Sequence, residues 1–149
     1  MELRDRLEAD LQKAMKERND ITRSVLRVVR SEMHNAEIAL QKPMDEDGII
    51  GVISKQVRQH RESIDAFQKG NRTDLVQLEE QELEILLDYL PPQLTLEEVT
   101  TLAQQTIQDV GATGPTDRGK VMGKLMPQVL GKAEGSVVND VVSQLLEKL

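Results

Sequence analysis

The spacing of apolar residues predicts helices along almost the whole chain. Apolar residues recur three or four positions apart, which is the period of a helix with one buried face. They rarely alternate with polar residues over a useful length, as the residues of a half-buried strand do. The ranges predicted to be helical are about 3–15, 20–40, 45–69, 73–90, 96–110, 116–130 and 136–149. The expected fold class is therefore all-α.

Several residues predict where these helices begin and end. Asp20 follows a break in the apolar pattern and is expected to cap the second helix. Thr95 and Glu98 have the spacing of a capping box. Pro91 and Pro92 cannot continue a helix. They predict a boundary between an N-terminal helical domain of about four helices, residues 1–90, and a small C-terminal three-helix domain, residues 94–149.

The amino-acid composition excludes several kinds of binding site. The formal net charge is -7, with 26 acidic against 19 basic residues, so DNA binding by the surface as a whole is not expected. A local basic patch remains compatible with this charge. Cysteine is absent, which excludes disulfides and thiolate metal sites. The two histidines, His34 and His60, are too few to indicate a metal site, so we expect no metal and no cofactor. His60 falls on the apolar seam of its helix and is interpreted as a hydrogen-bonded core residue.

Targeting signals are not evident in the sequence. No run approaches the 18 or so apolar residues of a membrane span, and the first ten residues, MELRDRLEAD, lack the apolar core of a signal peptide. We therefore expect a cytosolic protein without a membrane partner. With one phenylalanine, one tyrosine and no tryptophan, the chain also lacks aromatic platforms for stacking single-stranded RNA bases.

The segment 118–135, RGKVMGKLMPQVLGKAEG, differs from the acidic helices before it. It holds four glycines, four cations and a proline inside an apolar repeat. Residues 114–120 match the first seven positions of a phosphate-binding loop. However, Val121 stands where that motif needs a serine or threonine, and no strand is predicted before it, so this interpretation is set aside.

Two interpretations of this segment remain open. Gly119 and Gly123, four residues apart, allow another backbone to approach closely. That backbone belongs either to a neighbouring helix, with a solvated lysine edge beside it, or to an RNA ligand. In the second case the RNA-binding residues are Arg118, Gly119, Lys120, Gly123, Lys124 and Lys132.

The same segment resembles a known family. GKVMGKLMP followed by GKAEG is similar to the signature of the GatB/YqeY family, and so are LRVVRSEMHNAEI at residues 26–38 and LEILLDYLPPQLTLEE at residues 83–98. This family contains stand-alone YqeY-like proteins, which this chain resembles in length, and the tail domain of the B subunit of tRNA-dependent amidotransferases. The resemblance implies an all-helical fold and an association with glutamine-dependent carbon–nitrogen ligation, in which the tail domain helps to engage tRNA.

No catalytic residues are predicted. The chain has no cysteine to attack glutamine, no Gly/Ser-rich amidase loop, and acids spread along helix faces rather than paired. We therefore expect a non-catalytic tRNA-binding or accessory module, with tRNA and an amidotransferase or aminoacyl-tRNA synthetase as partners. The alternative is a protein–protein adaptor with no RNA role, which docks through Arg23, Arg27 and Arg30 on one helix face. That face also fits a solvated surface with local ion pairs.

Overall fold

The computed structural model describes residues 2–149, and these residues form helices without any strand. There are seven α-helices and one short 3-10 helix within this range: α1 (Leu3–Lys16), α2 (Asp20–Leu40), α3 (Glu46–Lys69), α4 (Thr73–Leu87), α5 (Leu96–Val110), η1 (Pro115–Asp117), α6 (Arg118–Val129) and α7 (Gly135–Glu147). The predicted all-α fold class is confirmed. None of the helices in the described range is both long and apolar enough to cross a membrane.

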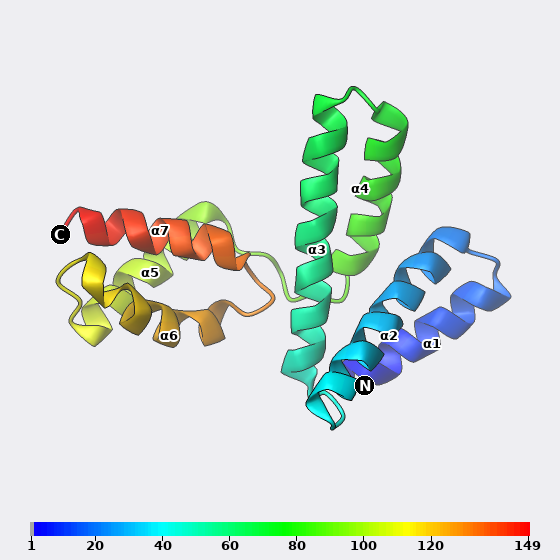
Figure 1. Cartoon of the computed structure of the whole chain (residues 1–149), viewed down its shortest axis with the longest axis horizontal. Helices are drawn as coiled ribbons and strands as arrows, with labels where there is room; N and C mark the ends of the chain where they lie inside the picture. Colours follow the sequence, from blue (N-terminus) through cyan, green and yellow to red (C-terminus); the bar gives the residue numbers. More distant parts are fainter. Residues whose placement is uncertain (1) are drawn as a thin grey trace. The chain divides into compact units, whose positions relative to one another are not determined.

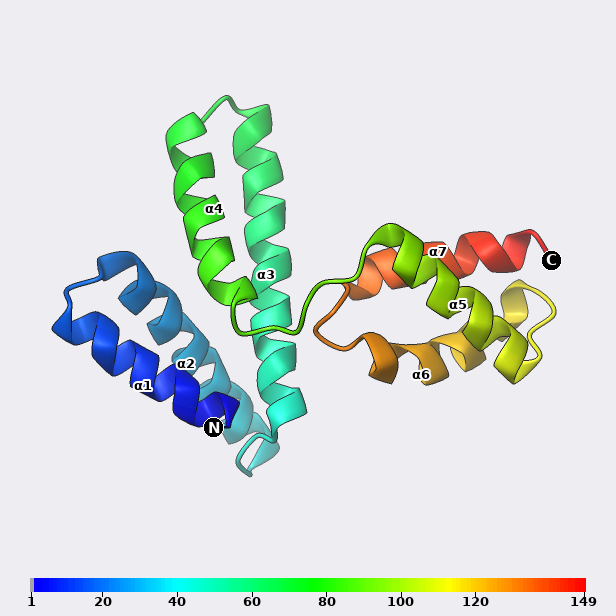
Figure 2. The same cartoon turned by 180° about the vertical axis from the view of Figure 1, so that it is seen from behind.

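The chain divides into two compact units, Met1–Pro91 and Pro92–Leu149. The first unit holds α1 to α4 as two antiparallel hairpins, α1 with α2 and α3 with α4 (Figures 1 and 2). The second unit holds α5, η1, α6 and α7, and its three α-helices all pack on one another. Each unit has its own apolar core.

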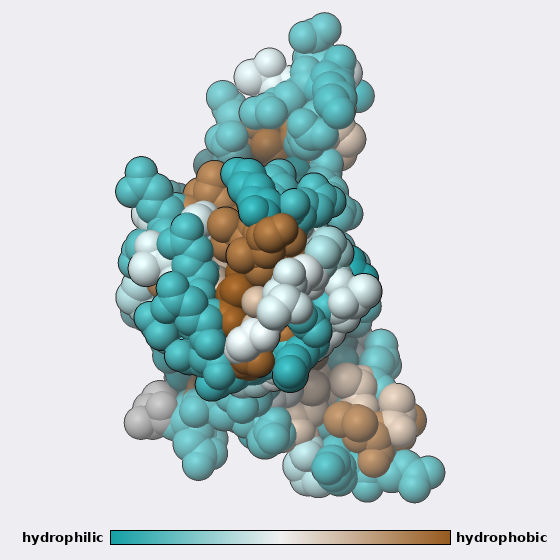
Figure 3. Space-filling model, turned by 90° about the vertical axis from the view of Figure 1, so that its left-hand side faces the viewer, coloured by the Kyte–Doolittle hydropathy of each residue, from teal (hydrophilic) through white to brown (hydrophobic). Residues whose placement is uncertain are grey.

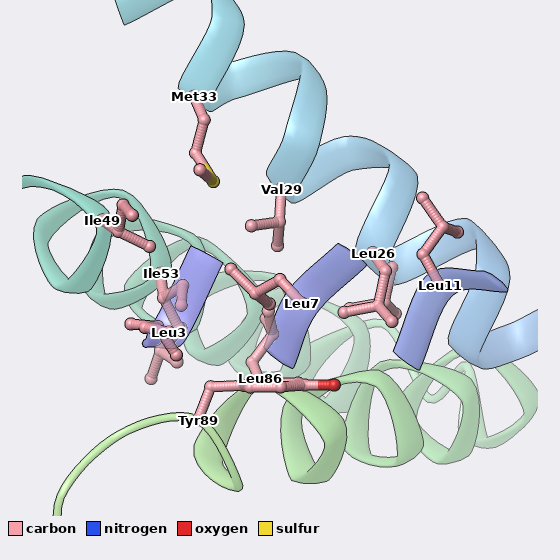
Figure 4. Packing of buried hydrophobic residues seen from close by; sticks show 12 residues of the cluster. Leu3, Leu7, Leu11, Leu26, Val29, Met33, Ile49, Ile53, Leu86 and Tyr89 are labelled. Carbon is pink, nitrogen blue, oxygen red and sulfur yellow. The ribbon is translucent and has the colours of Figure 1, made fainter. Parts of the chain in front are cut away.

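The core of the first unit draws on all four of its helices. Leu86 and Ile53 are fully buried, and Leu11 and Val29 are nearly so. Figure 4 shows their side chains gathered with residues from each helix. The other buried members are Leu3, Leu7, Val25, Leu26, Met33, Ile49, Val57 and Tyr89. Because no single hairpin buries its own apolar face, the two hairpins depend on each other for stability.

Polar contacts tie the two ends of this unit together. The Tyr89 hydroxyl donates to Asp10 Oδ2 at 2.5 Å, and the Arg6 guanidinium lies 4.5 Å from the centre of the tyrosine ring. Burial, with the Asp10 carboxylate adding to it, raises the pKa of Tyr89 above its ordinary value. Since the phenol stays protonated, it remains a donor to Asp10 over the physiological pH range.

Helix starts follow the side chains that can cap them. The capping box of α5 is confirmed, with Thr95 Oγ1 accepting from the Glu98 N–H at 3.2 Å and the Glu98 carboxylate accepting from the Thr95 N–H at 3.1 Å. The expected cap of α2 is off by one residue. Asn19, not Asp20, has the extended backbone of a cap, and its Oδ1 accepts from the Thr22 N–H at 3.2 Å. Both residue types make good caps, so the sequence could not separate neighbouring positions.

The second unit is a small three-helix core built almost entirely from valine, leucine and isoleucine. Val99, Ala103, Val121, Leu125, Val138, Val142 and Leu146 are buried in it together with Ile107, Val129 and Val141. Figure 3, which looks onto this unit, shows a band of hydrophobic side chains between hydrophilic ones. Its large apolar side chains with the greatest exposure are Leu149 at 64%, Leu96 at 63% and Val137 at 37%.

Candidate nucleic-acid interface

Helix α6 is started by a turn that its own side chains fix. Asp117 Oδ2 accepts from the Thr113 N–H at 2.8 Å and from the Thr113 hydroxyl at 3.3 Å. The hydrogen bond from the Thr113 backbone holds the pKa of the Asp117 carboxyl below its ordinary value, and the nearby charge of Lys120 acts in the same direction. Asp117 therefore stays ionised at the start of α6, where the peptide dipoles favour a negative charge.

One side of α6 packs in the core of the second unit. Val121, Leu125 and Val129, spaced four residues apart, are fully buried. Met122 and Met126 are half-buried beside them. This burial fixes the rotation of α6 about its axis, and it determines which residues face solvent.

The opposite side of α6 is open. Gly119, Gly123 and Pro127 form an exposed strip along it, spaced four residues apart. A Cβ atom built on either glycine meets nothing within 4 Å. The interpretation that these glycines serve close packing inside the three-helix unit is therefore wrong. A mid-helix glycine costs about 1 kcal/mol relative to alanine, and no internal contact compensates for it at Gly123.

Two lysines border the glycine strip. Lys120 and Lys124 are exposed and one turn apart, each following a glycine of the strip. The Lys124 ammonium lies 3.9 Å from Asp109 Oδ2 on α5, and both side chains are more than 40% exposed. Such an exposed, long ion pair contributes little to stability. Both lysines are therefore available to an anionic ligand. We call Gly119, Lys120, Gly123 and Lys124 the glycine–lysine face.

The other two predicted residues lie outside this face. Arg118 is exposed, but two residues amount to about 200° of helical turn, so it lies on roughly the opposite side of α6 from Lys120. Lys132 is half-buried in the connection that follows α6. Its backbone is held there, since its carbonyl accepts from the Leu94 N–H at 2.8 Å and its N–H donates to the Val129 carbonyl at 2.8 Å. Four of the six predicted residues are thus brought together.

Gly131 makes the turn that leads to Lys132. Its φ is 73°, in the left-handed region that glycine adopts without strain. Its carbonyl accepts from Gln93 Nε2 at 2.7 Å. The glycines of this segment therefore have two separate roles. Gly131 permits a buried turn, whereas Gly119 and Gly123 keep a surface flat.

Comparison with known proteins gives the family. The sequence profile described as "Yqey-like protein" matches residues 4–146. The chain belongs to the Yqey-like protein family. The resemblance inferred from the sequence motifs is confirmed, and the match spans both units.

Three curated relatives of this Yqey-like protein carry the name "Altered inheritance of mitochondria protein 41, mitochondrial". The protein of that name from Kluyveromyces lactis is 31% identical over 146 residues, which cover 93% of this chain and 79% of the relative. The one from Pyrenophora tritici-repentis is 27% identical over 146 residues, or 97% and 78% of the two chains. The one from Lachancea thermotolerans is 41% identical over 85 residues, or 56% and 46%.

The names of these relatives bear on the expected location of the protein but not on its expected tRNA-related function. The expectation of a cytosolic protein is wrong on this comparison, because the relatives are named as mitochondrial proteins. It rested on the charged first residues, and such a pattern excludes only one kind of targeting signal. The name of these three relatives mentions neither tRNA nor an amidotransferase, so those functions of this Yqey-like protein stay predictions.

Proposed function

We propose that this Yqey-like protein is a non-catalytic module that binds structured RNA, with tRNA as the ligand, and acts as an accessory to tRNA-dependent amidotransferases. The observation that carries the proposal is the glycine–lysine face of α6. It combines two exposed glycines, whose missing side chains meet nothing in the protein, with two exposed cations one turn apart.

The shape of this face suits a sugar–phosphate backbone. Helical RNA is recognised mainly by shape and by contacts to 2′-hydroxyls and phosphates across its shallow minor groove. The strip formed by Gly119 and Gly123 lets the α6 backbone come close to such a surface. Lys120 and Lys124 then lie beside the strip, where their ammonium groups reach phosphates.

Charge sets the strength of this binding. The chain carries a net charge of -7, and the face supplies two cations, so the RNA affinity is weak and falls with salt. Each phosphate contact contributes about 0.7–0.9 to the slope of log K against log salt concentration. Two contacts therefore give a slope of roughly -1.4 to -1.8.

The test is tRNA binding by the full chain across a salt series. Lys120→Ala with Lys124→Ala is expected to remove most of the affinity and most of the salt slope. The matched control is Lys13→Ala with Lys16→Ala, two exposed lysines of α1 that carry the same charge outside the face. Because relatives are named as mitochondrial, mitochondrial tRNA belongs among the probes. Equal losses in both double variants, or no loss in the first, would refute the assignment of the face.

The accessory role needs a separate assay. Adding the protein to a purified tRNA-dependent amidotransferase is expected to change the rate of amide transfer to charged tRNA. The K120A/K124A variant is expected to lose this effect, because the module acts through the bound RNA. An unchanged rate, with tRNA binding intact, would leave an RNA-binding module and remove its link to amidotransferases.

An adaptor role is the second candidate, and one feature of the first unit favours it. A groove of about 350 Å³ runs between α1 and α2, with Met15 exposed in it beside Arg27 and Arg30. Ion pairs already engage part of the predicted arginine face, since Arg30 lies 3.4 Å from Glu8 and Arg23 lies 3.0 Å from Asp20. Capture of an acidic protein that Arg27→Glu abolishes, in the absence of RNA binding, would favour the adaptor.

A further inference from the structure

A polar trio lies between the helices of the second hairpin of the first unit. His60 projects from α3, and Glu79 and Glu82, three residues apart, project from α4. The two helices run side by side in opposite directions (Figures 1 and 2). The three side chains are only 18%, 22% and 21% exposed. A half-buried helix contact is ordinarily filled by apolar residues, so three ionisable groups at one point of it require a reason.

The ligand atoms of the trio converge. His60 Nε2 lies 2.9 Å from Glu82 Oε2 and 3.6 Å from Glu79 Oε2. One nitrogen or oxygen of each residue lies within 4.8 Å of the others, and in the described range, residues 2–149, no other three His, Cys, Asp or Glu residues do so. Two ligand atoms bound at 2.0–2.1 Å to a tetrahedral Zn²⁺ lie roughly 3.3 Å apart, between the two observed distances.

A hydrogen bond to a residue outside the trio orients the His60 imidazole. His60 Nδ1 lies 2.8 Å from the backbone carbonyl of Gln56, one turn earlier on α3. A carbonyl only accepts, so Nδ1 carries the hydrogen and Nε2 is the atom that faces the carboxylates. Metal-bound histidines are held in the same way, by a hydrogen bond from the second ring nitrogen to a carbonyl or carboxylate. A metal ion at Nε2 needs the hydrogen on Nδ1, and it takes the place of the hydrogen that the 2.9 Å contact between Nε2 and the Glu82 carboxylate otherwise requires.

The charges at this point do not balance. With His60 neutral the trio carries two negative charges, and with His60 protonated it still carries one. Burial raises the pKa of Glu79 above its ordinary value, and the Glu82 carboxylate adds to this effect while His60 opposes it. In a partly desolvated position this excess of negative charge is unfavourable, and a divalent cation neutralises it.

We propose that His60, Glu79 and Glu82 form a divalent-metal site that joins α3 to α4. One imidazole nitrogen and two carboxylate oxygens suit Zn²⁺ among the abundant divalent ions, because Mg²⁺ and Ca²⁺ prefer oxygen ligands alone. Three protein ligands leave a position for water. The site is independent of the RNA-binding face, which lies in the other unit. It stabilises the hairpin by linking its two helices.

Zn²⁺ titration of the metal-free full chain tests the site. Calorimetry is expected to show one ion bound per chain. At a free Zn²⁺ concentration one hundred times the dissociation constant, the unfolding equilibrium constant is expected to fall about 100-fold, with a higher melting temperature by circular dichroism. Co²⁺ in place of Zn²⁺ gives an independent readout, as a visible absorption band whose intensity reports the coordination geometry.

The chain offers matched controls for each ligand type. His60→Gln is expected to abolish Zn²⁺ binding, whereas His34→Gln, at the exposed second histidine on α2, keeps it. Glu82→Gln is expected to weaken binding at least tenfold, whereas Glu80→Gln, at an exposed neighbour on α4, leaves it unchanged. Circular dichroism of each variant without metal verifies that the variant folds. If His60→Gln does not fold, Glu82→Gln takes its place as the test.

Two results would overturn the proposal. Zn²⁺ binding that survives both His60→Gln and Glu82→Gln would be adventitious binding to surface carboxylates. The absence of Zn²⁺ and Co²⁺ binding, with His60→Gln lowering the melting temperature, would instead make the trio an ionic contact in which a protonated His60 bridges two carboxylates.

Discussion

Replacing Gly123 by alanine tests whether this glycine serves packing inside the protein or contact with an RNA ligand. Gly123 lies within α6 and is exposed, and its backbone is not in the left-handed region, where only Gly111 and Gly131 occur among the described glycines. A Cβ atom at this position meets nothing within 4 Å. If the glycine served internal packing, alanine would clash. Since the space is open, alanine fits.

The expected magnitude follows from helix propensity alone. Alanine is favoured over glycine in a helix interior by about 0.8–1.0 kcal/mol. With no clash to offset this gain, Gly123→Ala is expected to raise the free energy of unfolding of the second unit by about 1 kcal/mol. In a unit of about 60 residues this corresponds to a rise in melting temperature of roughly 4–8 °C.

Hydrogen–deuterium exchange in the full chain measures this change locally. Peptides from residues 118–146 report the stability of α6 and α7, and peptides from the first unit serve as an internal reference. Gly111→Ala is the matched control. It also has open space, but its φ of 67° is left-handed, so alanine there is expected to destabilise the unit by about 1–2 kcal/mol. A loss of protection in Gly123→Ala similar to that in Gly111→Ala would refute the geometry of α6.

Binding of tRNA by the same variant gives the functional half of the test. If the glycine strip contacts the RNA backbone, Gly123→Ala weakens tRNA binding although it stabilises the protein. A bulkier Gly123→Leu is expected to weaken it further. Increased stability with unchanged tRNA affinity for both variants would remove the glycines from the proposed interface.

Three further predictions concern the stability of each unit. Thr95→Ala removes the acceptor of the α5 capping box and is expected to cost about 1 kcal/mol by urea denaturation. Leu125→Ala opens a cavity at a fully buried position and is expected to cost about 2–5 kcal/mol in the same assay. The hydrogen bond from the Met44 N–H, with the Arg4 guanidinium also donating, lowers the pKa of Glu37 below its ordinary value. This stabilisation is present above the ordinary carboxyl pKa and lost as pH falls through the lowered one. Glu37→Gln is therefore expected to lower the melting temperature at pH 7, and the difference from the unaltered protein is expected to shrink as the pH falls through the lowered pKa of Glu37.

The sequence predicted the helices well because each boundary is a local property. The cap of α5 at Thr95 and Glu98 needs only residues three apart, and the end of α5 at Gly111 needs one left-handed residue. The sequence predicted less well which face of each helix is buried. In α4, Val76 and Leu86 are buried, whereas the apolar side chain of Leu78 is 40% exposed. Which side of a helix is buried depends on the helices that pack against it, and these can lie far away in the sequence.

The candidate sites also depend on packing that the sequence does not show directly. The motif around Gly119 and Gly123 was visible in the sequence, but its exposure depends on how α6 rotates to bury Val121 and Leu125. The sequence analysis did not single out the trio of His60, Glu79 and Glu82, because two histidines in 149 residues give no ligand spacing. Only the register of α3 against α4 brings His60 to Glu82. The three-residue spacing of Glu79 and Glu82 was the one available signal.

The most direct test of the proposed function maps the RNA contact on the protein itself. Backbone amide NMR spectra of the ¹⁵N-labelled full chain, recorded while tRNA is added at low salt, locate the residues whose environment changes. The largest shifts are expected at Gly119, Lys120, Gly123 and Lys124, and they are expected to decrease as the salt concentration is raised. Shifts centred on Arg27 and Arg30 of α2, or no shifts at saturating tRNA, would contradict the proposed function.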